Sequence, residues 1–146
     1  MSERVIRVLV VDDDRAIRET LRALLQDEVY AVAEAGDGAQ AIALLRTLRD
    51  PHVVLTDLRM PVMDGTKLLE LVAEDDALVA RHAYAVITAN PEAVAAAVRA
   101  TRGRFSLPVL TKPFDLDDVL SYVAQTGARL LAGHETPPDV SRGLGW

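Results

Sequence analysis

Cysteine is absent from this sequence of 146 residues. The absence excludes a disulfide framework and any metal site built on thiolates, and it favours a reducing compartment, so we expect a cytoplasmic protein. Lysine is scarce as well, because Lys67 and Lys112 are the only two among 16 basic residues and the rest are arginine. Arginine is therefore the default cation of the chain, and each lysine needs a local reason.

Long hydrophobic runs are also missing. No uninterrupted apolar segment reaches the ~18 residues that span a bilayer, and the first residues, MSERVIRV, carry charge where a signal peptide has its apolar core. We therefore expect no membrane insertion. Basic charge is in deficit, with 16 basic against 22 acidic residues and a net charge of -6. This balance argues against direct nucleic-acid binding and suits a basic partner or a bound cation.

The sequence does contain a regular alternation of two hydrophobic periods. Its length and its hydrophobic content of 50% suit a single core, so we expect one domain over residues 1–132. Residues 133–146, rich in Gly and Pro and without periodicity, are expected to form a disordered tail or the start of a linker. Short apolar, β-branched runs predict five strands covered on both faces, at 5–11, 29–34, 52–56, 83–87 and 107–110.

Segments with helical spacing of apolar residues follow these strands. They predict five helices, around residues 17–25, 41–48, 68–72, 91–101 and 116–123. The fourth is alanine-rich and is expected to begin with Asn90 as its N-cap and Pro91 in its first turn. Strict alternation of strand and helix implies right-handed crossovers. The predicted fold class is therefore α/β, a doubly wound parallel sheet with helices on both faces.

Polar residues stand at the ends of four of the predicted strands. They are Asp12, Asp13 and Asp14 after the first strand, Asp57 after the third, Thr88 after the fourth and Lys112 after the fifth. In doubly wound sheets, ligands bind outside the carboxyl ends of the strands. Clustered carboxylates raise one another's pKa unless a cation compensates, and such an oxygen-rich site suits Mg²⁺. A lysine here, in an arginine-rich chain, indicates that a compact point charge is needed.

Other polar residues have simpler interpretations. Asp14 and Asp115 stand just before helical segments and are expected to be N-caps. His52, His82 and His134 have no metal-ligand spacing. The run Glu74-Asp75-Asp76 is interpreted as the solvated end of the third helix.

The residues at the strand ends resemble a known family, the receiver domains of two-component response regulators, of the chemotaxis-regulator type. The resemblance covers about residues 5 to 131, and its motifs appear in the family's order: LVVDDD, LTDLRMPVMDG, VITAN and LTKPF. It implies a flavodoxin-like sheet of strand order 2-1-3-4-5 with five helices. It also implies a phosphoprotein of a two-component phosphorelay.

The resemblance assigns a role to each matching residue. Asp57 would be the phosphoacceptor, and Asp13, Asp57 and the backbone carbonyl of Arg59 would bind Mg²⁺ directly, with Asp12 acting through water. Mn²⁺ is an alternative cation. The donor would be a sensor histidine kinase or a phosphotransfer protein, and the domain would be no enzyme beyond its own phosphorylation and dephosphorylation.

Two further residues complete the site that the resemblance implies. Thr88 would bond the phosphoryl group and Lys112 would pair with it, next to a cis peptide bond to Pro113. Output would be a protein contact, with homodimerisation through the fourth helix, fifth strand and fifth helix as one form.

The chain departs from the family pattern in the second half. Val109 stands where these domains usually carry an aromatic switch residue, and the 24 positions from Thr88 to Lys112 exceed the usual spacing by about two. The fourth helix is therefore expected to be irregular. Two alternatives stay open: a pseudo-receiver that takes no phosphate, and a haloacid-dehalogenase-type phosphohydrolase. The phosphohydrolase is disfavoured because it needs an acid where this chain has Arg59.

Overall fold

Five parallel strands form the centre of the molecule. The structure is a computed structural model that describes residues 4–135. The sheet has the order β2-β1-β3-β4-β5, as the resemblance implied. The strands are β1 (Arg7–Val11), β2 (Ala31–Ala35), β3 (Val53–Thr56), β4 (Ala83–Thr88) and β5 (Val109–Thr111).

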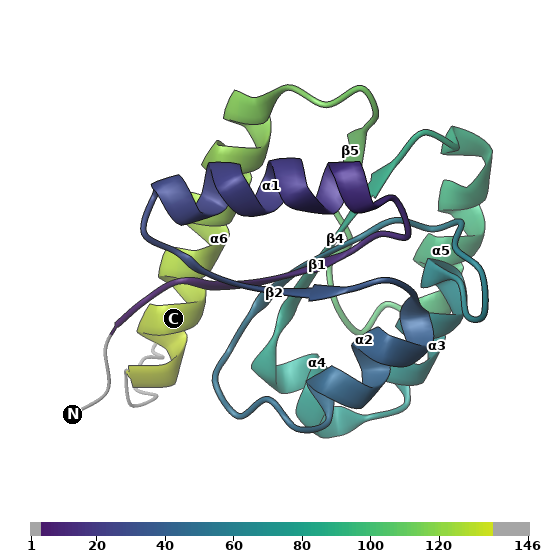
Figure 1. Cartoon of the computed structure of the whole chain (residues 1–146). Helices are drawn as coiled ribbons and strands as arrows, with labels where there is room; N and C mark the ends of the chain where they lie inside the picture. The colour runs from purple at the N-terminus through teal and green to yellow at the C-terminus, as the bar shows by residue number, and fades with distance from the viewer. Residues whose placement is uncertain (1–3, 136–146) are drawn as a thin grey trace.

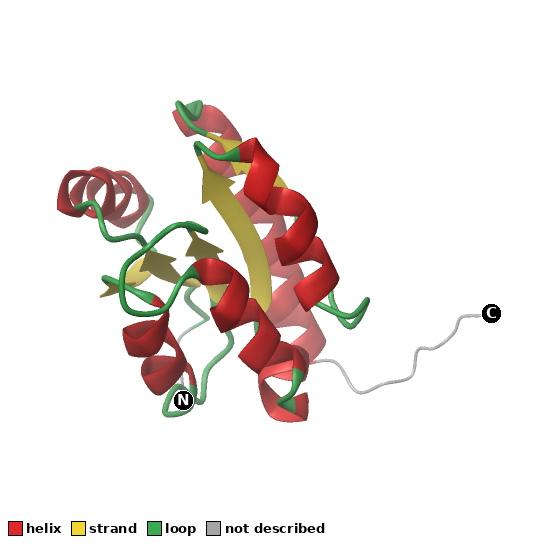
Figure 2. Cartoon of the chain, turned by 90° about the vertical axis from the view of Figure 1, so that its right-hand side faces the viewer, coloured by secondary structure: helices red, strands yellow, loops and turns green. Residues whose placement is uncertain are grey.

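Helices cover both faces of this sheet (Figures 1 and 2). They are α1 (Arg15–Asp27), α2 (Gly38–Leu45), α3 (Gly65–Ala73), α4 (Asp76–Arg81), α5 (Val94–Ala100) and α6 (Leu116–Glu135), with a 3-10 turn, η1 (Pro91–Ala93), before α5. Leu21, Leu25, Val119 and Val123 bring α1 and α6 onto one face. The apolar residues of α2, α3, α4 and α5 pack on the other face. The doubly wound α/β fold is thus confirmed.

The inner strands are apolar along their whole length because both of their faces are covered. All four residues of β3 are buried, and so are four of the five in β1. Their side chains divide by period two between the two cores, as Leu9 and Val54 join one and Val10 and Leu55 join the other. This burial fixes the register of the strands and thereby the positions of the residues that follow them.

The prediction of five helices was one short. Glu74 ends α3 as its C-cap, and Asp75 starts a new helix, α4, by accepting hydrogen bonds from the N–H groups of Ala77 and Leu78. The run Glu74-Asp75-Asp76 is therefore the largely solvated end of α3, as expected, and at the same time the junction with a second helix that was not expected. The periodicity missed α4 because six residues bury a single leucine, Leu78.

The segment after β4 is irregular, as its sequence predicted. A 3-10 turn of three residues precedes the seven-residue helix α5. Asn90 is the N-cap of this 3-10 turn and Pro91 lies in its first turn, as expected, but the Asn90 side chain makes no capping hydrogen bond. The peptide bond between Lys112 and Pro113 is cis, as expected.

Helix α6 closes the described part of the chain at Glu135. The domain boundary expected at residue 132 stays a prediction, because most of the segment 133–146 lies outside the described residues. Among residues 4–135, no helix is long and apolar enough to cross a membrane.

Candidate functional site

The carboxyl ends of β1, β3 and β5 meet at one edge of the sheet. Asp12 follows β1 directly, and its N–H donates to the carbonyl of Ala35 at 3.1 Å. Asp57 follows β3, and its N–H donates to the carbonyl of Val11 at 2.9 Å. These two bonds continue the sheet ladder by one residue, so the sheet itself positions both carboxylates.

Lys112 joins the two carboxylates. Its Nζ lies 2.7 Å from Asp12 Oδ2 and 2.9 Å from Asp57 Oδ2. Burial lowers the pKa of Lys112, but the hydrogen bonds to Asp12 and Asp57 outweigh that effect, so its pKa is raised. Lys112 is therefore a fixed ammonium charge, and the sequence prediction that it meets the aspartates is correct in its geometry.

Asp12 is the most deeply buried acid of the site, with 3% of its surface exposed. Burial raises its pKa, and the bonds from Lys112 and from the N–H of Asp14 only partly offset this effect. The neighbouring Asp57 charge raises it further. The hydrogen bonds from Lys112 and Asp14 thus do not fully compensate the negative charge of the Asp12 carboxylate.

Backbone groups fix the position of Asp57. Its Oδ1 accepts a hydrogen bond of 2.7 Å from the N–H of Leu58, and 8% of its surface is exposed. The N–H of Gly65 donates to the carbonyl of Leu58 at 2.9 Å. A Cβ at Gly65 would lie 2.1 Å from the Asp57 carbonyl oxygen, so only glycine permits this close approach.

Thr88 ends β4 between the strands that carry Asp57 and Lys112. Its side chain is fully buried, and its Oγ1 accepts a hydrogen bond of 3.0 Å from the N–H of Asn90. Its carbonyl accepts a hydrogen bond of 2.8 Å from the N–H of Lys112. The hydroxyl therefore lies at the start of the loop that leads from β4 into η1.

The three acids that the sequence singled out form a group suited to a metal ion. Asp12, Asp13 and Asp57 each offer a carboxylate oxygen, and these oxygens lie within 4.8 Å of one another. Asp13 is exposed, which leaves room for water ligands. An all-oxygen set with access to water fits Mg²⁺, and the raised pKa of Asp12 marks negative charge that a cation would relieve.

The other acids behave as their positions predicted. Asp14 caps α1 by accepting hydrogen bonds from the N–H groups of Ala16 and Ile17. Asp115 accepts one of 2.8 Å from the N–H of Asp117, at the start of α6. Neither belongs to the group of three.

Arg59, two residues after Asp57, forms an ion pair with Glu92 of η1. Arg59 Nη2 lies 2.7 Å from Glu92 Oε2, and both side chains are 60% exposed. The pair links the loop after β3 to η1. Exposure to water makes its contribution to stability small.

Three site features were not predicted from the sequence. Arg18 donates from Nη1 to the Asp12 carbonyl at 2.7 Å and from Nε to Glu34, which also pairs with Arg22. Gly65 and Glu92 are the others. Arg18 meets Asp12 and Gly65 meets Asp57 through turns of the chain, and Glu92 meets Arg59 from another loop. None of these contacts is visible as a periodic pattern in the sequence.

This arrangement defines a class: a doubly wound α/β domain with a carboxylate cluster and a lysine at the carboxyl ends of its strands. A family model of the response regulator receiver domain matches residues 8–124. The chain belongs to the response regulator receiver domain family.

Two of the curated relatives come from mycobacteria. The DNA-binding response regulator MtrA of Mycobacterium tuberculosis (strain ATCC 25618 / H37Rv) is 31% identical over 134 residues, which cover 92% of this chain and 54% of MtrA. The response regulator MprA of Mycolicibacterium vanbaalenii is 35% identical over 135 residues, covering 92% and 53%. The chain therefore spans about half the length of these relatives.

Solved structures agree on the fold. The signal receiver domain of an HD domain-containing protein from Pseudomonas fluorescens Pf-5 has a TM-score of 0.76 at 25% identity, covering 92% of this chain and 96% of that one. The chemotaxis response regulator CheY4 of Vibrio cholerae has a TM-score of 0.70 at 27% identity, covering 84% and 98%.

Proposed function

We propose that this receiver domain accepts a phosphoryl group on Asp57 in a reaction that depends on Mg²⁺. One observation carries the proposal: the Lys112 ammonium bridges Asp12 and Asp57 within a group of three carboxylates at the carboxyl edge of the sheet. A half-buried lysine that contacts both acids is suited to neutralise phosphoryl oxygens placed among them.

The transfer is an in-line displacement. A carboxylate oxygen of Asp57 forms a bond to phosphorus as the bond from phosphorus to the donor breaks, which is P–N in phosphohistidine and P–O in acetyl phosphate. The leaving group takes the electron pair of the broken bond. Asp57 is oriented for attack by the N–H of Leu58.

The cation would be held by carboxylates and one backbone oxygen. Asp13, Asp57 and the Arg59 carbonyl would bind Mg²⁺, or Mn²⁺ in its place, and Asp12 would act through water. When bound, the cation supplies positive charge beside phosphoryl oxygens that become more negative in the transition state. The geometric grouping of Asp12, Asp13 and Asp57 supports this assignment.

Phosphorylation of Asp57 would change the conformation of the loop between β4 and α5. The phosphoryl group adds close to two negative charges and three hydrogen-bond acceptors. Thr88 Oγ1 accepts from the N–H of Asn90, so its own proton is available to donate to a phosphoryl oxygen. Movement of Thr88 would reach η1 and α5 through that same hydrogen bond. The phosphoryl group would thus bias a two-state element.

Partners follow from this chemistry. A sensor histidine kinase or a phosphotransfer protein would supply the phosphoryl group, and a protein contact would carry the output. Homodimerisation through α5, β5 and α6 is one form of that contact. The haloacid-dehalogenase-type alternative is not favoured, because the position of its general acid holds Arg59, whose side chain pairs with Glu92.

Intact mass after incubation with acetyl phosphate tests the proposal. We expect a mass gain of one phosphoryl group in the presence of Mg²⁺ and none with EDTA. Asp57→Asn should abolish the gain, and Asp13→Asn should remove most of it. Asp14→Asn is the matched control, because Asp14 caps α1 outside the metal group, and it should react like the wild type. A wild-type chain that gains no phosphoryl group would favour the pseudo-receiver.

A further inference from the structure

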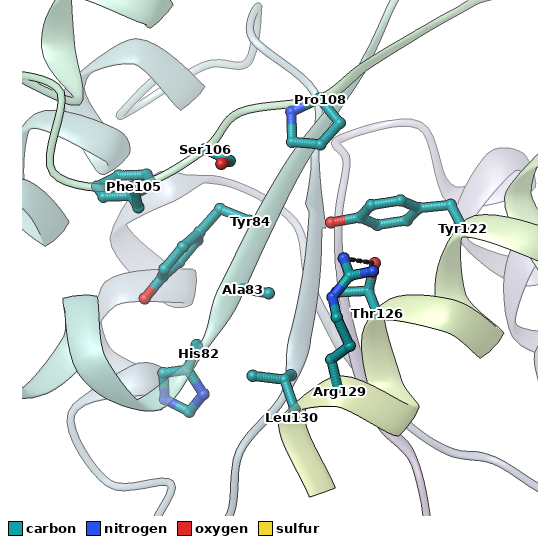
Figure 3. Close-up of a pocket in the computed structure, with 10 residues that line it drawn as sticks. All are labelled: His82, Ala83, Tyr84, Phe105, Ser106, Pro108, Tyr122, Thr126, Arg129 and Leu130. Carbon is teal, nitrogen blue, oxygen red and sulfur yellow. Dashed lines mark hydrogen bonds between the residues drawn. The ribbon is translucent and has the colours of Figure 1, made fainter. Parts of the chain in front are cut away.

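A cavity lies between β4, the segment that leads into β5, and α6, and the proposed phosphorylation makes no use of it. Its volume is about 290 Å³, at the small end of the range for ligand pockets. Figure 3 shows Phe105, Ser106 and Pro108 on one side and Tyr122, Thr126, Arg129 and Leu130 on the side of α6. Ala83 and Tyr84 of β4 lie between them.

The edge of β4 is open at this cavity because β5 starts late. The ladder between the two strands begins at Val86, whose N–H donates to the Pro108 carbonyl. Ala83 donates its N–H to the carbonyl of His52, just before β3, so by the alternation of the ladder the backbone N–H and C=O of Tyr84 face the side of β5. Pro108 has no N–H to offer the Tyr84 carbonyl. A donor and an acceptor therefore stand together at the cavity.

The side of the cavity formed by α6 carries a cation without a carboxylate partner among residues 4–135. Arg129 Nη2 donates to Thr126 Oγ1 at 3.4 Å, a weak bond, and no acid of the described chain pairs with this guanidinium. Among the described residues seven other arginines form ion pairs with acids, whereas Arg129, like several others, does not. The cavity thus has a positive end.

Tyr122 adds a neutral donor beside this cation. Burial raises the pKa of its hydroxyl, against smaller opposing effects of Thr126 and Arg129, so the hydroxyl stays protonated at neutral pH. Pro108 and Leu130 supply apolar surface to the lining, and the ring of Phe105 packs against that of Tyr84 at a centroid distance of 4.9 Å. The lining therefore combines a cation and a hydroxyl on α6, apolar side chains and an open strand edge, with His82, Ser106 and Thr126 as further polar members.

We infer that this cavity is a binding site for a small aromatic carboxylate. The carboxylate meets Arg129 and Tyr122, the ring lies against Pro108 and Leu130, and a hydroxyl on the far side of the ring pairs with the open backbone of Tyr84. A hydroxyl suits that edge because it both donates and accepts. The volume admits a one-ring molecule. The inference rests on the cavity alone and holds whether or not Asp57 is phosphorylated.

Amide chemical shifts of the whole chain during titration with 4-hydroxybenzoate test the site. We expect saturable shifts at Ala83, Tyr84, Ser106 and Arg129. 4-Hydroxybenzamide has the same shape without the charge and should bind more weakly. Arg129→Gln should weaken binding of the acid by about fivefold or more and leave binding of the amide unchanged, because it removes only the charged hydrogen bond.

Two variants complete the experiment. Arg46→Gln makes the same charge change at the end of α2, away from the cavity, and should leave both titrations unchanged. Ala83→Leu should fill the cavity and abolish binding of both compounds, with the melting temperature as the check on folding. The inference is overturned by shifts that do not saturate, by equal affinity for the acid and the amide, or by an Arg129→Gln chain that binds the acid as the wild type does.

Discussion

The Lys112 ammonium lies 2.9 Å from Asp57 Oδ2, and a second contact of 2.7 Å holds it on Asp12. These two contacts fix a point charge at the place where the proposed phosphoryl group would arrive. The side chain is 14% exposed, so the surroundings leave little freedom for a group of another shape.

Lys112→Arg should impair the response even though it keeps the charge. A planar guanidinium is larger than an ammonium and cannot occupy the same point between two carboxylates. We expect beryllofluoride to shift the amides from Ala89 to Leu110 less in this variant than in the wild type. Lys67→Arg is the control, since the ion pair of Lys67 is with Glu70 of the same helix, α3. Equal shifts in Lys112→Arg and wild type would contradict the proposed role of the lysine.

Gly65→Ala should distort the backbone at Asp57. The added Cβ would lie 2.1 Å from the Asp57 carbonyl, and backbone must move to relieve this contact. We expect a loss of about 1–3 kcal/mol in the free energy of unfolding, as for other overpacked positions, and slower phosphorylation. Denaturant unfolding and the acetyl phosphate reaction measure the two effects.

The control for that substitution is Gly133→Ala. Nothing lies within 4 Å of the Cβ it would add, and the position is helical, so we expect no loss of stability. A Gly65→Ala chain as stable and as reactive as Gly133→Ala would show that the close approach at Asp57 has no importance.

Val29→Gly should stabilise the protein. Val29 follows α1 with a φ of 65°, in the left-handed region that a β-branched residue adopts at a cost, and its side chain is 81% exposed. Relief of strain should exceed the entropy cost of glycine, with a gain of about 0.5–1 kcal/mol in unfolding free energy.

Val98→Gly, at an exposed position within α5, provides the comparison. It should cost about 0.5–1 kcal/mol, because glycine weakens a helix where the backbone is unstrained. The two valine variants should therefore have opposite signs in urea unfolding. A loss of stability in both would show that Val29 is not strained.

The stability of the fold should fall as the pH drops below neutral, in part through His52. Burial lowers the pKa of this histidine, and a backbone contact with Asp50 only partly opposes it. The folded state therefore binds the proton more weakly than the unfolded state. The contribution of His52 is complete above its unfolded pKa of about 6.5 and is lost as the pH falls toward the folded pKa.

Urea unfolding at several pH values between 7.5 and 5.5 measures this loss. His52→Asn removes the titration and keeps a donor for the Asp50 carbonyl, so its stability should depend less on pH than that of the wild type. The difference in slope can reach at most about 1.4 kcal/mol per pH unit for one proton. Parallel curves for the two proteins would exclude His52 as a source of the pH dependence.

Much of the fold was predictable because the sheet is covered on both faces. Runs such as 52–56 and 83–87 have no other place in a small protein than an inner parallel strand, and their ends bring Asp57 and Thr88 to one edge. Helix α4 was missed because it is short and amphipathic only through Leu78. The hydrophobic periodicity of a helix can be recognised in a sequence only when the helix is several turns long.

The site was predictable only where a strand end carried it. Asp12, Asp57 and Lys112 follow strands, and alignment of parallel strands makes them neighbours. Arg18 reaches the Asp12 carbonyl from a helix, and Glu92 meets Arg59 from another loop. Such contacts depend on the angle at which an element packs and on side-chain rotamers, which spacing in the sequence does not encode.

The position of the phosphoryl group is the most direct test of the central claim. The chain is incubated with Mg²⁺ and acetyl phosphate, reduced with borohydride so that an aspartyl phosphate becomes homoserine, and digested for peptide mass mapping. We predict homoserine at residue 57 and at no other aspartate, Asp12 and Asp13 included. Homoserine at another aspartate, or a phosphoryl group that remains on the Asp57→Asn chain, would contradict the account.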